Sequence, residues 1–245
     1  MEVLNRVKKI EDISIIEKYY NKLKVNNFFK KDIKNYIEFL KFDKNEYLCR
    51  EGDEISNFMI FIDGKAKVFK TLPNGKTFLL AFYRPIQVIG DMEIIKNQVA
   101  SSTIQALSEC YCLSIPMEKA RYELTADSEF LKFICESLAE KLSVISINSS
   151  INLLYPLENR LASYINELPK LVDDKSEKEY IDFDENLIDI AELLGSSYRH
   201  LLRTLNNLIK KGVLEKDSAG YIVVNKELLK KLAGDLYTDT RFHSF

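Results

Sequence analysis

The chain has few of the residues from which catalytic and metal sites are usually built. It contains no tryptophan and only two histidines, four cysteines and eight glycines in 245 residues. The cysteines show neither a disulfide framework nor Cys-x-x-Cys metal spacing, so free thiols are predicted. No phosphate loop, nucleophile elbow or histidine-based triad is visible. The sequence therefore predicts no enzyme, no catalytic residue, no metal ligand and no cofactor.

Long hydrophobic runs are also missing. Charges interrupt every apolar stretch of the opening MEVLNRVKKIEDISIIEKYY, and no later run is long enough to cross a bilayer. We therefore expect a cytoplasmic protein with no membrane partner. Its 46% hydrophobic and 29% charged residues are typical of a folded chain, and its length favours two domains.

The net charge of −2 argues against a protein that coats nucleic acid through bulk electrostatics, but the charge is unevenly distributed. Residues 186–234 carry eight basic and five acidic side chains, a balance of +3, whereas residues 172–185 carry two basic and seven acidic ones, a balance of −5. This change of sign indicates that only the C-terminal unit approaches a polyanion. An acidic linker beside an ordinary surface would look similar.

Residues 41–115 read as short strands broken by turn signals, a pattern typical of an all-β sandwich or barrel. Asp63-Gly64 and Asn74-Gly75 each predict a two-residue hairpin turn. Two helices are predicted before this region, at residues 10–23 and 31–39. These first forty residues are candidates for covering the barrel or for contacting RNA polymerase.

A long helix is predicted from about residue 127 to 152, where there is no glycine or proline. Apolar residues in it follow the 4-3-4-3 spacing of a coiled-coil seam, which favours a homodimer. Phe130, Phe133, Ile134 and Ile147 supply a second apolar face, so the helix can alternatively pack on its own barrel, and both faces can be used together. The predicted dimer-interface residues are Leu131, Cys135, Leu138, Leu142 and Ile145.

The segment LIDIAELLGSSYRHLLRTLNNLIKKGVLEKDSAGYIVVN has the elements of a winged helix-turn-helix in the required order. A short helix ends at Gly195, a second helix begins near Ser197, and a hairpin wing follows Gly212. Leucines face inward from the second helix, so its polar side chains project outward. An arginine fork can bond guanine O6 and N7, and a serine at a helix start can bond a phosphate, which predicts a partner of double-stranded DNA. The candidate DNA-binding residues are Ser196, Ser197, Tyr198, Arg199, Arg203 and Asn206.

Taken in order, these segments resemble the Crp/Fnr family of bacterial transcription regulators. REGDEISNFMIFIDGKAKVF is similar to the family's cyclic-nucleotide-binding barrel, and VIGDMEII is similar to the start of its phosphate-binding cassette. The resemblance implies an α+β fold in three parts. These are N-terminal helices with a double-stranded β-helix (jelly-roll) effector barrel at 1–126, a dimerisation helix at 127–152 and a winged helix-turn-helix domain at 153–245. It places Tyr198, Arg199 and Arg203 where the family reads bases in the major groove.

The chain departs from the family at the cassette. In members that bind cyclic AMP, an arginine of an Arg-Ser pair holds the cyclic phosphate, whereas here Ala100 or Ser101 occupies that position. Neither side chain can neutralise a buried phosphate, so cyclic AMP is not expected as the effector. The alternatives are a less charged, unknown small-molecule effector or a barrel that has lost its ligand. The candidate effector-pocket residues are Gly90, Asp91, Ser101 and Ser102.

The family's iron–sulfur centre is not expected, because no cysteine precedes Cys49. Cys110 and Cys112 lie two apart on a strand and so face one way, which permits redox or metal chemistry, although core packing is favoured. The sequence thus predicts a homodimeric transcription regulator that binds a palindromic operator under control of an effector or redox signal at the barrel. The alternative is a ligand-sensing regulatory module whose winged helix contacts a protein partner.

Overall fold

The computed structural model describes residues 8–10, 19, 29–30, 36–172, 179–183, 186–234 and 236–237. The chain folds as two compact units. Residues 1–70 and 82–143 form the first unit, and residues 71–81 and 144–245 form the second. No helix among the described residues is long and apolar enough to cross a membrane.

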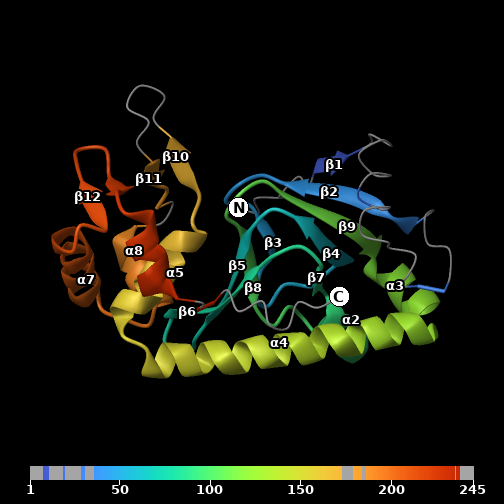
Figure 1. Cartoon of the computed structure of the whole chain (residues 1–245). Coiled ribbons are helices and arrows are strands. Elements are labelled where there is room, and N and C mark those ends of the chain that lie inside the picture. Colours follow the sequence, from blue (N-terminus) through green and yellow to red (C-terminus); the bar gives the residue numbers. More distant parts are fainter. Residues whose placement is uncertain are drawn as a thin grey trace. The chain divides into compact units, whose positions relative to one another are not determined.

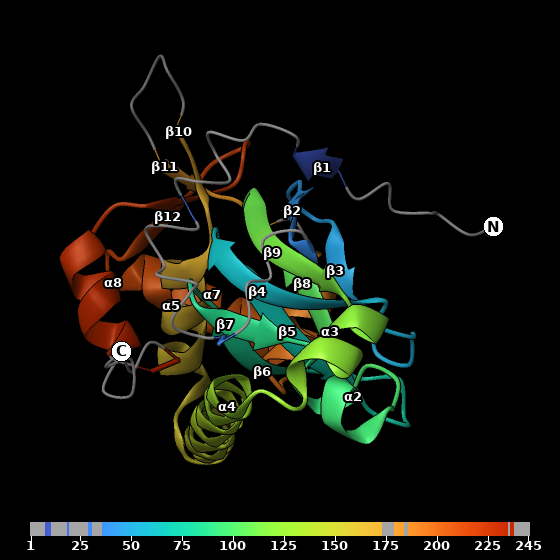
Figure 2. The same cartoon turned by 90° about the vertical axis from the view of Figure 1, so that its right-hand side faces the viewer.

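The first unit is built on two antiparallel sheets, which Figures 1 and 2 show from two sides. Its strands are β1 (Lys8–Ile10), β2 (Glu38–Phe42), β3 (Tyr47–Cys49), β4 (Asn57–Asp63), β5 (Ala66–Thr71), β7 (Gln87–Ile89), β8 (Thr103–Ala106) and β9 (Cys110–Pro116). One sheet has the order β1-β2-β9-β4-β7, and the other contains β3, β8 and β5 as neighbours. The predicted jelly-roll architecture is confirmed, with its strands in separate sheets rather than in one closed barrel.

Strand β4 is buried on both faces, which explains its almost continuous apolar sequence. Phe58 and Ile60 join a core cluster with residues of the helices α2 (Asp91–Lys96) and α3 (Met117–Leu124). On the opposite face Phe61 pairs with Cys112 of β9. Aromatic and β-branched side chains suit such a pleated surface, so the local sequence and the tertiary packing agree here.

The two predicted hairpin turns need correction. Asp63-Gly64 joins β4 to β5, and these strands lie in different sheets, so the turn is not a β-hairpin. Gly64 is nevertheless required, because it has φ +101° and a Cβ there would overlap the backbone oxygen of Glu109. The second turn is a three-residue loop, Pro73–Gly75, since the Leu72 amide donates to the Lys76 carbonyl at 2.8 Å.

The predicted N-terminal helices are wrong at the ends that the structure describes. Ile10 is the last residue of β1, and Phe39 lies in β2, where it pairs with Leu113 of β9. Non-local sheet pairing outweighs the local helix propensity at these positions. Tyr19 is helical, while residues 11–18, 20–28 and 31–35 lie outside the described residues.

The predicted long helix is confirmed as α4 (Ser128–Leu154), which Figure 1 shows as one continuous rod. Asp127 caps it, because its Oδ1 accepts the Glu129 amide at 2.9 Å. Phe130 and Ile134 are fully buried in the core cluster of the first unit. The unit boundary falls within this helix, between residues 143 and 144.

The second unit contains the predicted winged helix-turn-helix. Its elements are most of β6 (Thr77–Tyr83), the end of α4, α5 (Leu157–Glu167), β10 (Lys170–Val172), β11 (Glu179–Ile181), α6 (Leu187–Leu193), α7 (Tyr198–Lys210), β12 (Leu214–Lys216), β13 (Tyr221–Val223) and α8 (Lys226–Ala233). The sheet order is β10-β11-β13-β12. The acidic stretch at residues 172–185 is therefore not only a linker, because it contains β11, which pairs with β10. Residues 173–178 and 184–185 lie outside the described residues.

The turn between α6 and α7 has the predicted chemistry. Gly195 has φ +60°, a left-handed conformation that glycine adopts at little cost. On the inner side of α7, Leu201, Leu205 and Leu208 are fully buried, as their spacing predicts. This packing fixes which face of α7 is directed to solvent.

Candidate functional site

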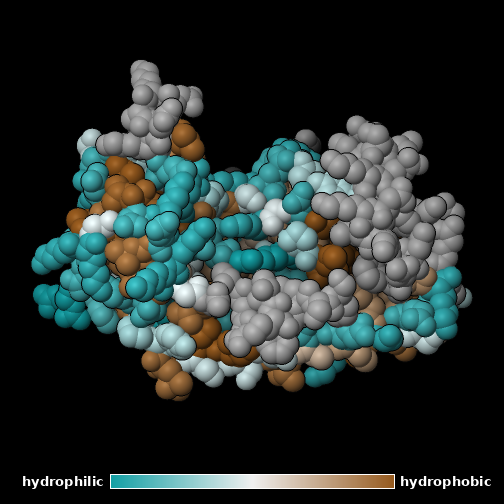
Figure 3. Space-filling view, viewed as in Figure 1, coloured by the Kyte–Doolittle hydropathy of each residue, from teal (hydrophilic) through white to brown (hydrophobic). Residues whose placement is uncertain are grey.

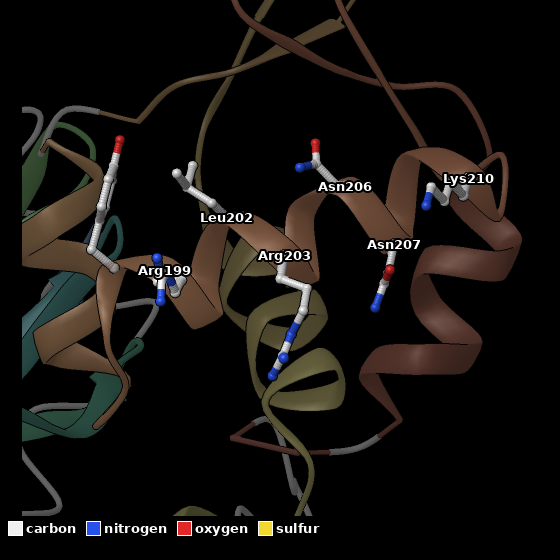
Figure 4. A pocket seen from close by; sticks show the side chains of 7 residues that line it. Arg199, Leu202, Arg203, Asn206, Asn207 and Lys210 are labelled. Atoms are coloured by element: carbon white, nitrogen blue, oxygen red, sulfur yellow. The ribbon is translucent and has the colours of Figure 1, made fainter.

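The outer face of α7 lines a groove of about 470 Å³. Figure 4 shows its side chains standing along one side of the helix. The structure places the predicted residues Tyr198, Arg199, Arg203 and Asn206 together on this face, and all four are exposed. The residues that line the groove are Tyr198, Arg199, Leu202, Arg203, Asn206, Asn207 and Lys210.

Three of these groove residues were not among the sequence candidates. Leu202, Asn207 and Lys210 lie three or four positions along α7 from the predicted arginines and asparagine. Residues with this spacing share a helix face, so helical periodicity could have identified them. Leu202 adds an apolar surface of the kind that contacts a thymine methyl group.

The guanidinium groups of Arg199 and Arg203 have no carboxylate partner among the described residues. By contrast, Lys211 at the other end of α7 lies 2.7 Å from Glu158 Oε2. An unpaired, exposed guanidinium keeps all its donors for a guanine edge or a phosphate. The positive charge of this face is therefore concentrated where an incoming polyanion would meet it.

The two candidate serines differ in their surroundings. Ser197 is the N-cap of α7, and its Oγ accepts the His200 amide at 3.2 Å. Ser196 Oγ is buried and has no hydrogen-bond partner among the described residues. Ser197 is therefore the better placed of the two for an external phosphate.

In the first unit, the predicted pocket begins at Gly90, which precedes α2. Gly90 has φ +94°, and a Cβ there would lie 3.0 Å from the Met117 methyl group, so a larger residue would be strained. Asp91 follows and is only 2% exposed. Its carboxylate lies 2.7 Å from Lys141 Nζ and accepts the Ser137 hydroxyl at 3.2 Å.

Lys141 projects from the inner face of α4 and completes a buried network. Besides Asp91, its ammonium donates to the Val88 carbonyl at 2.7 Å and lies 5.6 Å from the Tyr83 ring centroid. Burial by itself would lower the pKa of Lys141, but its contacts with Tyr83 and Asp91 raise the pKa above the ordinary lysine value. The group therefore stays charged, and α4 is joined to the start of α2 by an ion pair whose carboxylate is buried and whose lysine side chain is 19% exposed. Sequence analysis missed Lys141, although it follows Ile134 by seven residues on the same inward face.

The remaining pocket residues are held by neighbouring protein groups. The Ser101 amide donates to Glu93 Oε1 at 3.2 Å, and the Ser101 carbonyl accepts Lys70 Nζ at 3.0 Å. The Ser102 carbonyl faces the Cys49 thiol at 3.6 Å. Each of these contacts lies within the first unit, and Ser101 and Ser102 are themselves partly buried.

The three thiols on strands β3 and β9 are poor nucleophiles. Burial raises the pKa of Cys49 to about 12 and that of Cys110 to about 11, and it also raises the pKa of Cys112. These groups stay protonated at neutral pH, while Cys135 is exposed on α4. Within the described ranges, no group of three or more histidine, cysteine or acidic residues is arranged to hold a metal ion.

Two protein-family models match the chain in the order of its units. The cyclic nucleotide-binding domain matches residues 39–127, and the Crp-like helix-turn-helix domain matches residues 159–232. These matches coincide with the jelly-roll strands and with the winged helix-turn-helix.

Similar proteins align over most of the chain. Regulatory protein YeiL from Escherichia coli O157:H7 is 31% identical over 214 residues, covering 87% of this chain and 94% of that protein. The CRP-like cAMP-activated global transcriptional regulator of Mycobacterium tuberculosis is 20% identical over 193 residues, covering 78% and 86%. A solved CRP-family transcriptional regulator from Thermus thermophilus has a TM-score of 0.61 at 18% identity, covering 79% of this chain and 96% of that one. That last likeness concerns the fold alone.

Removing Lys141 will test the strength of the buried pair. We expect Lys141→Met to lower the free energy of unfolding by about 3–5 kcal/mol, because it leaves the Asp91 carboxylate buried without its partner. Urea denaturation measures this change, and adding Asp91→Asn should recover much of the loss. The control is Lys132→Met, which removes an exposed ion pair on the same helix (3.8 Å from Glu136) and should cost at most about 0.5 kcal/mol. Equal effects of the two single substitutions would contradict a buried pair.

A pH dependence follows from Glu93. Burial raises its pKa above the ordinary 4.5, so the folded state holds this proton more tightly than the unfolded state. Its contribution to stability is therefore greatest below pH 4.5 and is lost as the pH rises through the raised pKa. Glu93→Gln should raise the melting temperature at pH 7 more than at pH 4, measured by calorimetry. The exposed Glu118→Gln should show no such difference between the two pH values.

Proposed function

Because this chain belongs to the Crp/Fnr family of transcription regulators, which are not enzymes, we propose that it acts in the cytoplasm as a homodimer binding a palindromic operator through α7. The observation that carries the proposal is the outer face of α7. There, two arginines without carboxylate partners among the described residues stand beside a tyrosine and an asparagine, over an inner face of fully buried leucines. Such a helix suits direct readout in the major groove, with Ser197 and the helix start near a phosphate.

The exposed face of α4 supports the homodimer. Leu131, Leu142 and Ile145 are 37%, 71% and 39% exposed, and Cys135 is exposed beside them. Leu138 differs, because it partly packs against the core of the first unit. Figure 3 shows hydrophobic surface along the lower edge of the view, over α4. A stripe of this kind favours burial against the same stripe of a second copy.

Two-fold pairing through α4 would present two copies of α7. In dimeric helix-turn-helix proteins the recognition helices enter successive major grooves, about 34 Å apart along one face of the duplex. The operator then has two half-sites in inverted order, one for each subunit. We therefore propose that the operator is palindromic.

For the signal, we favour a small effector of low charge over cyclic AMP. Ala100 or Ser101 stands where cyclic-AMP-binding members carry arginine, and two lysines of this region, Lys141 and Lys70, are already paired with Asp91 and Glu51. A cyclic phosphate would have to compete with these carboxylates for a cation. A redox signal in the jelly-roll is less favoured because its buried thiols stay protonated. An effector bound near Gly90 and Ser102 would act if its affinity differed between two conformations of the protein that place α4 differently.

Substitution of Arg203 tests the assignment to DNA. Wild-type protein should select a sequence with two half-sites from a random duplex library. Arg203→Ala should weaken binding to that sequence by roughly 1–3 kcal/mol per lost bidentate contact, and it should reduce the preference for one base at one position of each half-site. Fluorescence anisotropy against single-base variants of the selected duplex measures both effects.

The control for that experiment is Lys230→Ala, an exposed residue of α8 in the same unit. It removes the same charge, so it should change affinity little and leave base preference intact. If the wild-type protein selected no duplex at all, a ligand-sensing module with a protein partner would replace the proposal.

The dimer is tested at the centre of the α4 stripe. Leu142→Glu should convert the dimer to a monomer, because two leucines, each contributing about 1.5–3 kcal/mol of burial, are replaced by two charges that face each other. Analytical ultracentrifugation gives the dissociation constant. Tyr122→Glu, at an 82% exposed position on α3, is the matched control and should leave the dimer intact. A wild-type protein that stayed monomeric at micromolar concentration would refute this part of the proposal.

A further inference from the structure

The end of α4 holds β6 through two asparagine side chains. Asn148 Nδ2 donates to the Leu80 carbonyl at 2.7 Å, and Asn152 Nδ2 donates to the Leu79 carbonyl at 3.4 Å. All four residues belong to the second unit. The position of β6 along the helix is therefore set by hydrogen bonds as well as by apolar packing.

Asn152 also contacts the segment that follows α8. Its Oδ1 accepts a hydrogen bond from the hydroxyl of Tyr237. Tyr237 is buried and has φ +59°, a left-handed conformation that is rare for an aromatic residue and that surrounding contacts must maintain. Burial raises the pKa of Tyr237 to about 12, against the opposing effect of the neighbouring Arg160 guanidinium, so the hydroxyl keeps its proton for Asn152.

Arg160 extends the chain of contacts to the turn before α7. This buried residue of α5 donates from Nε to the Tyr155 carbonyl at 3.2 Å and from Nη1 to the Leu194 carbonyl. Leu194 is the C-cap of α6, where helix carbonyls lack helical partners. The Arg160 Nη1 atom would also lie 3.9 Å from a Cβ built on Gly195, so it adjoins the turn itself.

We propose that Asn152, Tyr237 and Arg160 are positioning residues that couple β6 to the α6–α7 turn, so that moving β6 along α4 reorients α7. The inference rests on the proposed function in so far as α7 is the DNA-contacting helix. Residue 81 of β6 is bonded to residue 82 of the first unit, which gives a signal from the jelly-roll a covalent route to the strand. From the strand, the route runs from Asn152 to the Tyr237 hydroxyl and from there to the neighbouring Arg160 guanidinium, which opposes the rise that burial causes in the pKa of Tyr237. From Arg160 it continues to the carbonyl that precedes the turn.

A purely structural reading of the same contacts is that each hydrogen bond stabilises its own surroundings. The two interpretations differ in whether a substitution of Asn152 alters the stability of the α6–α7 turn. Asn152 does not bond to the α6–α7 turn directly, so a selective effect on that turn requires transmission through Tyr237 and Arg160.

The test measures amide hydrogen exchange in the full-length protein without DNA. The reporters are the Gly195 and Ser196 amides, which donate to the Glu192 and Ala191 carbonyls, each at 2.8 Å. Asn152→Ala and the milder Tyr237→Phe should each speed exchange at these amides by roughly 2- to 30-fold relative to the buried amides of α7. Asn159→Ala is the matched control, because it removes a 2.9 Å bond to the Leu232 carbonyl in the same unit but outside this chain of contacts.

Two results would overturn the proposal. One is unchanged exchange at Gly195 and Ser196 in both variants, and the other is an equal acceleration of every amide in the second unit, which indicates general destabilisation. Because this measurement needs no DNA, it stands whether or not the protein binds an operator. With the selected duplex, Tyr237→Phe should weaken binding without altering base preference, unlike Arg203→Ala.

Discussion

The orientation of α4 about its own axis, which decides which of its side chains face inward, is the constraint on which the other features depend. Its inner face carries Lys141, Asn148 and Asn152, and each of these side chains donates a hydrogen bond to a backbone carbonyl. A buried polar group left without a partner costs about 1–3 kcal/mol, so a rotation that broke these contacts would be penalised several times over. Because the inner face is fixed, Leu142 and Ile145 necessarily point outward.

The inner contacts differ in kind along the helix. In the first unit a charged pair, Lys141 with Asp91, favours one arrangement strongly, because separating buried charges is costly. In the second unit, amide side chains bind backbone carbonyls of β6, and such neutral bonds contribute about 1 kcal/mol each. The helix is thus anchored more firmly by its contact in the first unit than by its contacts with β6 in the second.

Periodic features were predictable from sequence, and non-local pairings were not. The span of α4 and the buried leucines of α7 follow from helical spacing, and the order of the helix-turn-helix elements follows from Gly195 and its neighbours. The assignment of β4 and β5 to different sheets depends on strands far along the chain, so the Asp63-Gly64 signal was misread. The partner of Asp91 lies 50 residues away on another element, and only the fold brings it there. The candidate pocket residues were predicted from the family resemblance and not from the spacing of residues in the sequence.

The division of the chain has a consequence for how such proteins diversify. The unit that contains the winged helix includes residues 71–81, and these are enclosed in sequence by residues of the other unit. A genetic exchange that replaced everything before α4 with a foreign sensor would also remove the strand to which Asn148 and Asn152 are bonded. New signal specificity in this architecture is therefore more accessible through point changes within the jelly-roll than through wholesale recombination of modules.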